Sequence, residues 1–279
     1  MRVIHQSFFK VLRHVIAIGG DSIVNIDILH ETLGSGLAGT VLLLAGLLLV
    51  PAAAHAQDWT LYDELLAAHV APVEREGIRF HGVDYAAWAQ DPRYPQLLAQ
   101  IESHPLDSLQ SEADTLAFYI NVYNVYAIRM VIDNAPLTSI RDAGSLFSPV
   151  WKKPVGSLGG RTVTLDEIEH QILRPMGEPR VHFAIVCASL SCPDLRRESF
   201  SAARLETQLQ EQTQGFLDNA GKGLQQDGSR VRVSQIFDWF EDDFDSAGGV
   251  EAFVSRYHPL PAGARLRADI PYNWNLNAQ

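Results

Sequence analysis

The chain has 279 residues, 47% of them hydrophobic, and a net charge of −11 at neutral pH. It contains no run of Lys and Arg to neutralise phosphates, so we expect no nucleic-acid partner. The acidic cluster Glu241–Asp245 is interpreted as a solvated face, because a calcium site needs more evenly spaced oxygen ligands.

The first 56 residues are interpreted as a segment that precedes the folded domain. Residues 37–50 are almost all apolar, and Ala54 and Ala56 fit the cleavage site of a secretory signal peptide. A start site placed too far upstream explains the extension before this run. The alternative is a membrane anchor over residues 37–54, which just reaches spanning length. We expect a periplasmic or secreted protein, with membrane contact only if the anchor is retained.

Helices are expected in the first part of the domain that follows, which we place at residues 57–279. Apolar periodicity predicts helices over residues 59–70, 94–101 and 111–132, with a turn into a short helix at 82–88. Ser111 with Asp114 three residues later is typical of a helix N-cap. The helix over 111–132 is apolar almost all round, so we expect it to be central and buried.

Strands are expected mainly in the later part of the domain. Gly159–Gly160 and Asp227–Gly228 predict turns of hairpins over residues 151–164 and 223–233. A final strand is predicted at 265–270, helices at 165–173, 201–217, 237–244 and 250–257, and either a strand or a helix at 181–186. Helices first and strands later favour an α+β fold. We expect a single domain whose buried central helix packs on a mostly antiparallel sheet, with surrounding helices.

Two asparagines interrupt the apolar central helix. Asn121 and Asn124 are three residues apart and share a helix face, and buried amides are costly without partners. They either tie the helix to neighbouring loops or face a cleft and orient a catalytic group or a substrate.

A second polar group lies in the segment over 165–173. His170 and Arg174 are four residues apart and share one helix face. For His170 a structural and a functional role stay open, whereas Glu169 is interpreted as part of a helix-surface pair.

The only two cysteines, Cys187 and Cys192, follow a short apolar run in the segment His182–Pro193. One interpretation is a disulfide, which an exported protein favours. Another is a thiolate nucleophile with His182 or His170 as base and Asn121 or Asn124 as orienting group. Cys192, next to Pro193 at the loop end, is then the better nucleophile. The third interpretation is metal binding or simple packing, although the spacing is a weak match to a zinc site.

The chain resembles a known family in four segments: residues 118–124, 165–174, 180–193 and 272–277. Together they are similar to the domain-of-unknown-function family 547, over about Trp59 to Asn277. The resemblance implies that the matching residues belong together in space, namely Asn121, Asn124, His170, Arg174, Arg180, His182, Cys187, Cys192 and Pro193. The family has no settled activity that could be transferred to this chain.

We expect a thiol-dependent hydrolase or acyl/amide transferase that acts on a small-molecule or peptide ligand. Its expected catalytic residues are Cys192, Cys187, His182, His170, Asn121 and Asn124, and its expected substrate-binding residues are Arg180, Arg174 and Ser191. Papain- and transglutaminase-like enzymes use a similar set in a different chain order. No phosphate loop or dinucleotide fingerprint occurs, so no cofactor and no metal is expected. The alternative is a non-enzymatic periplasmic binding or interaction module with a Cys187–Cys192 disulfide.

Overall fold

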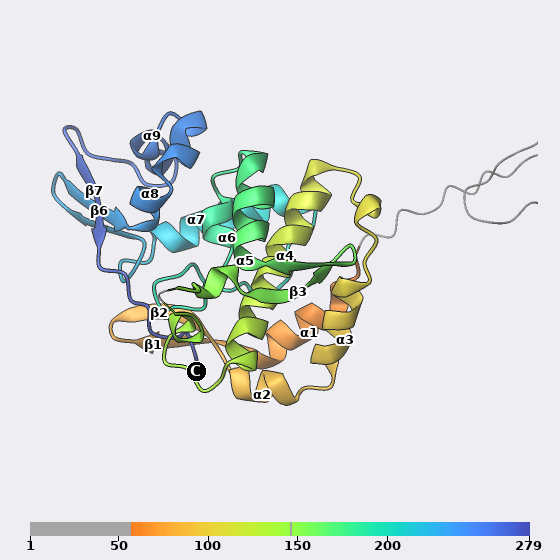
Figure 1. Ribbon diagram of the computed structural model, residues 1–279. Coiled ribbons are helices and arrows are strands. Elements are labelled where there is room, and N and C mark those ends of the chain that lie inside the picture. Colours follow the sequence, from red (N-terminus) through yellow and green to blue (C-terminus); the bar gives the residue numbers. More distant parts are fainter. Residues whose placement is uncertain (1–56, 146) are drawn as a thin grey trace, which may run out of the picture. The chain divides into compact units, whose positions relative to one another are not determined.

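The computed structural model describes residues 57–145 and 147–279 (Figure 1). The expected cleavage site and the apolar run before it lie outside the described residues. Within the described chain, helices surround one long helix and three small sheets lie apart from one another. The α+β class is confirmed.

Helix α4, Glu112–Asp133, is the central helix. The Ser111 hydroxyl accepts a hydrogen bond from the Asp114 amide at 3.0 Å, which confirms the predicted N-cap. By length and composition α4 could cross a membrane, but 83% of its most apolar stretch is buried inside the domain. The apolar character of α4 therefore serves the core of the fold, as the sequence predicts.

The N-terminal part contains three helices and one hairpin. Helices α1 (Thr60–His69), α2 (Tyr85–Gln90) and α3 (Arg93–Glu102) agree with the expected segments. Strands β1 (Val70–Arg75) and β2 (Ile78–Val83) form an antiparallel hairpin that we did not predict. Its turn residues Glu76 and Gly77 both have positive φ, 54° and 73°, as a two-residue hairpin turn requires. Glu is unusual there, so the sequence carried no clear turn signal.

The middle of the chain contains the hairpin predicted from Gly159–Gly160. Strands β3 (Pro154–Leu158) and β4 (Arg161–Thr164) form the predicted hairpin. Thr164 and Glu167 cap each other at the start of α5 (Leu165–Glu167). A π-helix over Ile168–Leu173, η4, continues directly from α5. π-Helical turns are rare and are frequent at functional sites.

The C-terminal part closes with a three-stranded sheet. Residues Val181–Ala184 form helix α6, which decides between the strand and the helix expected there, and α7 spans Leu205–Leu217. Strands β5 (Leu224–Asp227) and β6 (Arg230–Ser234) are antiparallel, whereas β7 (Arg265–Ile270) pairs with β6 in parallel. A parallel pair needs a long crossover, which here contains α8 (Ile236–Trp239), η6 (Glu241–Ala247) and α9 (Val250–Ser255). Short 3-10 turns complete the order at Leu106–Ser108, Ile140–Ala143, Val150–Lys152 and Arg174–Met176.

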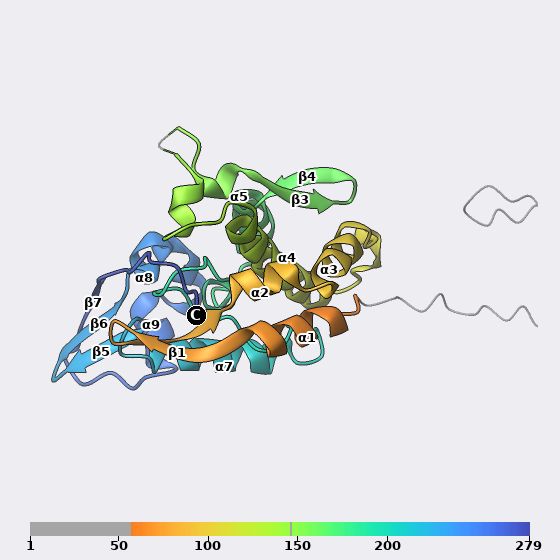
Figure 2. The same cartoon turned by 90° about the horizontal axis from the view of Figure 1, so that it is seen from below.

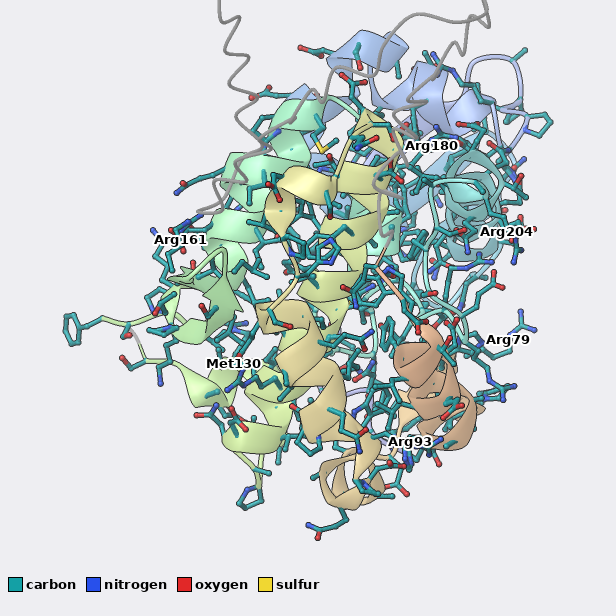
Figure 3. All side chains as sticks on the ribbon, turned by 90° about the vertical axis from the view of Figure 1, so that its right-hand side faces the viewer. Arg79, Arg93, Met130, Arg161, Arg180 and Arg204 are labelled. Carbon is teal, nitrogen blue, oxygen red and sulfur yellow. A yellow bond between two sulfur atoms is a disulfide. The ribbon has the colours of Figure 1, made fainter. Side chains whose placement is uncertain are left out.

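The sheet arrangement corrects one expectation. Instead of one sheet under the central helix, the described chain has two separate hairpins and the β5–β6–β7 sheet. Figures 1 and 2 show this sheet, with α8 and α9, at one end of the domain and helices α1–α3 at the other. One apolar cluster surrounds α4, and a second, rich in phenylalanine, lies between α6, α7 and the crossover. Apolar side chains of α4 such as Met130 are buried, whereas Arg79, Arg161 and Arg204 lie on the surface (Figure 3).

Candidate functional site

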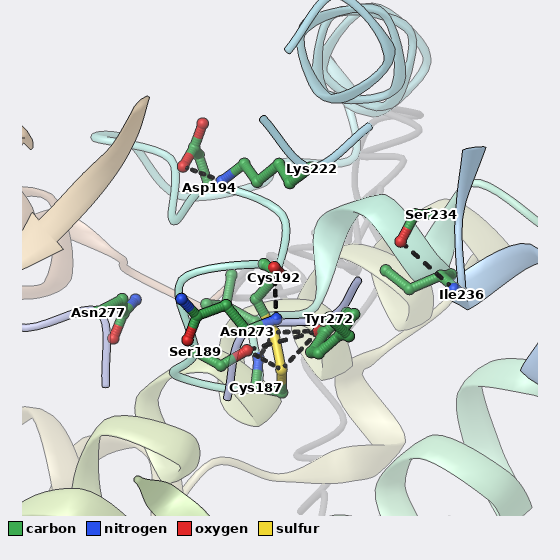
Figure 4. The surroundings of a disulfide bond; sticks show 12 residues. Cys187, Ser189, Cys192, Asp194, Lys222, Ser234, Ile236, Tyr272, Asn273 and Asn277 are labelled. Atoms are coloured by element: carbon green, nitrogen blue, oxygen red, sulfur yellow. Dashed lines mark hydrogen bonds and ion pairs between the residues drawn. A yellow bond between two sulfur atoms is a disulfide. The ribbon is translucent and has the colours of Figure 1, made fainter. Parts of the chain in front are cut away.

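The two cysteines are joined to each other. Cys187 and Cys192 form a disulfide with their Cα atoms 5.9 Å apart, within the usual range for such a bond (Figure 4). Cys192 is buried, whereas Cys187 is partly exposed. Ala188 between them has a φ of +58°, which is uncommon for a residue with a Cβ. Of the interpretations left open by the sequence, the structure contains the disulfide.

The C-terminal segment 272–277, here called the strap, holds the loop between Cys187 and Cys192, here called the cysteine loop. The amide of Leu190 donates to the carbonyl of Asn275 at 2.8 Å, and the amide of Asn277 donates to the carbonyl of Ala188 at 3.1 Å. The Tyr272 hydroxyl lies 3.2 Å from Sγ of Cys187 and 3.3 Å from Sγ of Cys192 (Figure 4). Disulfide sulfurs have no proton to give, so the hydroxyl is the donor to them. The C-terminal motif therefore contributes directly to the surroundings of the disulfide.

The disulfide forms part of the wall of a pocket of about 340 Å³. Most of the other lining side chains are aromatic or aliphatic, and three carry a carboxyl or an imidazole group. The lining residues come from α4, the 3-10 turn Val150–Lys152, the π-helix, α6, the cysteine loop, α8 and the C-terminal segment: Tyr123, Trp151, Glu169, His170, His182, Ile185, Cys187, Cys192, Pro193, Ile236, Trp239, Phe240, Tyr272 and Trp274. Pockets of this size and apolar character, with a few polar groups, are typical of small-molecule sites.

His182 is held by an acidic partner in this pocket. Its Nε2 lies 2.6 Å from Oδ2 of Asp243, and its ring stacks on Phe240 with centroids 4.1 Å apart. Burial lowers the pKa of His182 to about 4, although the hydrogen bond to Asp243 acts in the opposite direction. The imidazole is therefore neutral at neutral pH and donates from Nε2 to the carboxylate.

Asp243 joins the neutral His182 to the guanidinium of Arg174. Arg174 makes a bidentate pair with this carboxylate, with N–O distances of 2.6 and 2.9 Å. Burial opposes ionisation of Asp243, but the hydrogen bonds from Arg174 and His182 outweigh it and lower its pKa. The expectation of a purely solvated acidic face is thus wrong for Asp243, because chain folding brings it to partners more than sixty residues away.

Glu169 faces the pocket rather than a helix-surface partner. Its Oε2 accepts a hydrogen bond from the Tyr123 hydroxyl at 3.0 Å. Burial raises the pKa of Glu169, while the nearby charge of His170 and the Tyr123 hydroxyl act in the opposite direction. The interpretation of Glu169 as a surface pair is therefore wrong. Its neighbour His170 meets Arg174 as expected, with Nδ1 and Nη1 3.1 Å apart.

The two asparagines are buried and bonded to backbone. The Asn124 amide donates to the carbonyl of Ala184 at 3.0 Å and accepts from the amide of Val186 at 2.8 Å. Asn121 makes the same two-sided contact with Phe200, with both distances 2.8 Å. Neither residue lines the pocket. The structure thus gives them the tying role, and Asn124 fixes the end of α6 from which the chain runs to Cys187.

The residues expected to bind substrate also lie outside the lining. Arg180 pairs with Glu178 and Glu206. The Ser191 hydroxyl accepts from the Asn273 amide at 2.8 Å, so it holds the strap. Arg174 contacts the pocket from behind, through Asp243, through His170 and by packing over the Phe240 ring.

The pocket thus brings together four of the expected site residues: His170, His182, Cys187 and Cys192. Two further lining residues were missed from the sequence, Glu169 and Tyr272, as was Asp243, which bonds to His182. Tyr272 begins the C-terminal motif of the family resemblance, which was the one signal that could have found it. Among residues 57–145 and 147–279, no group of three or more His, Cys, Asp or Glu side chains is placed to hold a metal ion.

Comparison with known proteins agrees with the resemblance in the sequence. Residues 106–217 match the model of a family described as "Protein of unknown function, DUF547". The resemblance to this family is confirmed. The DUF547 segment contains three of the four motifs, and the fourth, at residues 272–277, lies beyond it. No curated protein and no solved structure gives a significant match.

Proposed function

We propose that the domain is a binding module for a small-molecule or peptide ligand, with the aromatic pocket as its site. The observation that carries the proposal is the closed Cys187–Cys192 disulfide in the wall of this pocket. A disulfide is not a nucleophile, since the thiolate is the reactive form of cysteine. The pocket nevertheless offers a preformed apolar surface.

The aromatic residues indicate where a ligand makes contact. Trp239 is 43% exposed although it is large and apolar. Its ring stacks on Trp274 with centroids 5.7 Å apart, and both pack on Tyr272. Exposed apolar surface beside a cavity is typical of a binding site. The partly buried Glu169 carboxyl and the neutral His182 supply the polar groups that orient a ligand.

A thiol-dependent hydrolase or acyl/amide transferase is the second candidate. It is supported by the partly exposed Cys187, which lines the same pocket as His182, and by the hydrogen bond that holds His182 to Asp243. It requires reduction of the disulfide and a base close to the free thiol. Within the described chain, the hydrogen-bonding partners of the two sulfurs are the Tyr272 and Ser189 hydroxyls and the Cys187 amide, not an imidazole. We therefore place this candidate second.

Export remains part of the proposal. The apolar run and the small residues before Gln57 support secretion to the periplasm or beyond, and disulfides persist in such oxidising compartments.

The binding proposal is tested with a neutral fluorescent probe. N-phenyl-1-naphthylamine should bind the unreduced protein at one site, with fluorescence that rises as the probe leaves water. Trp239→Ala should weaken this binding about fivefold, because it removes an aromatic contact worth roughly 1 kcal/mol. Phe147→Ala is the matched control, since Phe147 is 95% exposed and does not line the pocket. Equal affinities for the two variants would contradict the proposal.

The two candidates are separated by thiol labelling. Iodoacetamide should leave both cysteines of the unreduced protein unlabelled if the domain is a binding module. Labelling of one cysteine without reductant, lost on His182→Ala, would favour the thiol enzyme instead.

A further inference from the structure

We propose that the Cys187–Cys192 disulfide undergoes thiol–disulfide exchange with a thiol-bearing ligand held in the aromatic pocket. This activity goes beyond the proposed binding function and uses the same pocket. It rests on the position of the two sulfurs, on their different exposure and on the donors around them.

The two cysteines differ in exposure. Both cysteines line the pocket, but Cys192 is only 2% exposed whereas Cys187 is partly exposed. Exchange requires a thiolate to attack one sulfur of the disulfide while the other leaves. The geometry assigns Cys187 as the attacked sulfur and Cys192 as the leaving sulfur.

Two hydrogen-bond donors lie close to the leaving sulfur. The Cys187 amide donates to Sγ of Cys192 at 2.8 Å, and the Tyr272 hydroxyl lies 3.3 Å from the same sulfur (Figure 4). Donors aimed at a developing negative charge stabilise it, and a leaving thiolate that is stabilised leaves faster. The Tyr272 hydroxyl lies 3.2 Å from Sγ of Cys187 as well, so the Cys187 amide is the donor that distinguishes Cys192 as the leaving sulfur.

Tyr272 is fixed independently of the sulfurs. It packs between Trp239 and Trp274, with ring centroids at 4.8 and 4.6 Å. The next residue, Asn273, bonds to Ser191 inside the cysteine loop. The hydroxyl is therefore preorganised towards the disulfide.

The exchange balances without a further oxidant. The ligand thiolate attacks Sγ of Cys187, a new sulfur–sulfur bond forms, and the Cys187–Cys192 bond breaks with its electron pair on Sγ of Cys192. A second thiol of the ligand then attacks the mixed disulfide at the ligand sulfur and releases Cys187. The ligand dithiol is oxidised to a disulfide, and its two protons end on the two cysteines.

The pocket wall selects the kind of thiol. Aromatic side chains line most of it, and its acid, Glu169, is partly buried. A cysteine flanked by an apolar residue in a peptide fits this wall better than a small, highly charged thiol does. We therefore assign a peptide with two cysteines as the ligand class, and glutathione is the alternative source of the same chemistry.

The test uses the full chain purified without reductant. It is incubated under native conditions with a reduced peptide that has two cysteines, each next to a phenylalanine, or with glutathione at equal thiol concentration. Samples are quenched with iodoacetamide and the reduced cysteines are counted by mass spectrometry. We expect the peptide to reduce the disulfide at least tenfold faster than glutathione. Equal rates would support exchange but overturn the peptide assignment. Reduction that occurs only in denaturant overturns exchange altogether.

Two variants test the direction of the attack. With a glutathione-disulfide probe, Cys192→Ser should form a mixed disulfide on Cys187 at least tenfold faster than Cys187→Ser forms one on Cys192. Equal rates in the two variants overturn the assignment of Cys187 as the attacked sulfur.

A third variant tests Tyr272 as a positioning residue. Tyr272→Phe should slow the exchange about tenfold and raise the pH midpoint at which reduced Cys192 is alkylated. A tyrosine with only a packing role would leave this midpoint unchanged. Tyr257→Phe is the matched control, because Tyr257 packs against the second apolar cluster and does not line the pocket. Binding of N-phenyl-1-naphthylamine reports the pocket separately, so a failure of exchange and a failure of ligand binding are distinguishable.

Discussion

At the scale of single residues, His182 shows how burial and a partner compete for one proton. The side chain is 1% exposed, and its acidic partner Asp243 is shared with Arg174. Because the carboxylate is already neutralised by the guanidinium, it holds the imidazole in place without keeping it protonated. Burial therefore dominates and lowers the pKa of His182 to about 4.

This competition predicts a dependence of stability on pH. The pKa of His182 falls from 6.5 to about 4 on folding, so between these values the unfolded chain binds the proton and the folded chain does not. Stability should therefore fall as the pH falls from 6.5 to 4, by up to about 3 kcal/mol from this group. Urea unfolding between pH 4 and 7 should show a shallower decline for His182→Gln than for the unchanged protein.

Comparing the pH dependence of stability between His182→Gln and the unchanged protein separates the contribution of His182 from that of other groups. The raised pKa of Glu169 acts in the opposite direction within this range, but it is common to both proteins. Parallel stability profiles would show that His182 is not kept neutral by the fold.

At the scale of elements, the site depends on how α4 holds α6. Asn124 bonds to the carbonyl of Ala184 and to the amide of Val186, on both sides of the point where α6 ends. The chain then enters the cysteine loop, whose far side is bonded to the C-terminal strap. The central helix therefore positions the disulfide although it contributes only Tyr123 to the pocket wall.

Removing this link should destabilise the domain. Asn124→Ala leaves a buried carbonyl and a buried amide without partners, which should cost about 3 kcal/mol. Thermal unfolding should then occur roughly 6–12 °C lower, given the size of the domain. Asn134→Ala, at the C-cap of the same helix, is the matched control and should cost under about 1 kcal/mol, since its amide donates to the Met130 carbonyl of the last helical turn. A similar loss in both variants would argue against a special role for Asn124.

At the scale of the whole molecule, the sequence predicts a leader segment that is removed and a folded domain that remains. Residues 37–50 are apolar and end close to small residues, whereas the folded domain begins near Gln57 with α1. The length and composition of the apolar run are those of a signal-peptide core. We therefore expect the domain to act without its N-terminal segment.

Mass spectrometry of the protein from its native host tests this expectation. The mature N-terminus should lie within a few residues of Gln57, in the soluble fraction of an exported compartment. Recovery of peptides from residues 1–50 in the membrane fraction would instead support the anchor.

Much of the fold was accessible from local sequence patterns. Ser111 with Asp114 marked the start of α4, and Gly159–Gly160 and Asp227–Gly228 marked two hairpin turns. These signals act over a few residues and do not depend on the rest of the chain. The β1–β2 hairpin was missed because Glu76 occupies a positive-φ turn position that usually carries Asn, Asp or Gly.

The separate sheets were decided by long-range pairing. Strand β7 pairs with β6 in parallel across the whole α8–α9 crossover, a partner that its own residues do not specify. The β3–β4 hairpin itself follows from its local turn, but its residues do not show that it remains a sheet of its own.

For the candidate site, the sequence by itself determined which residues could carry chemistry: two cysteines close together, His170, His182 and the two buried asparagines. Only the tertiary structure decided what each of them meets. It joined Cys187 to Cys192, turned Asn121 and Asn124 towards backbone, and brought Asp243 to His182 and Tyr272 to the sulfurs. The physical reason is that residue type sets which hydrogen bonds and charges are possible, whereas partners and burial, which set protonation and reactivity, depend on segments far apart in the chain.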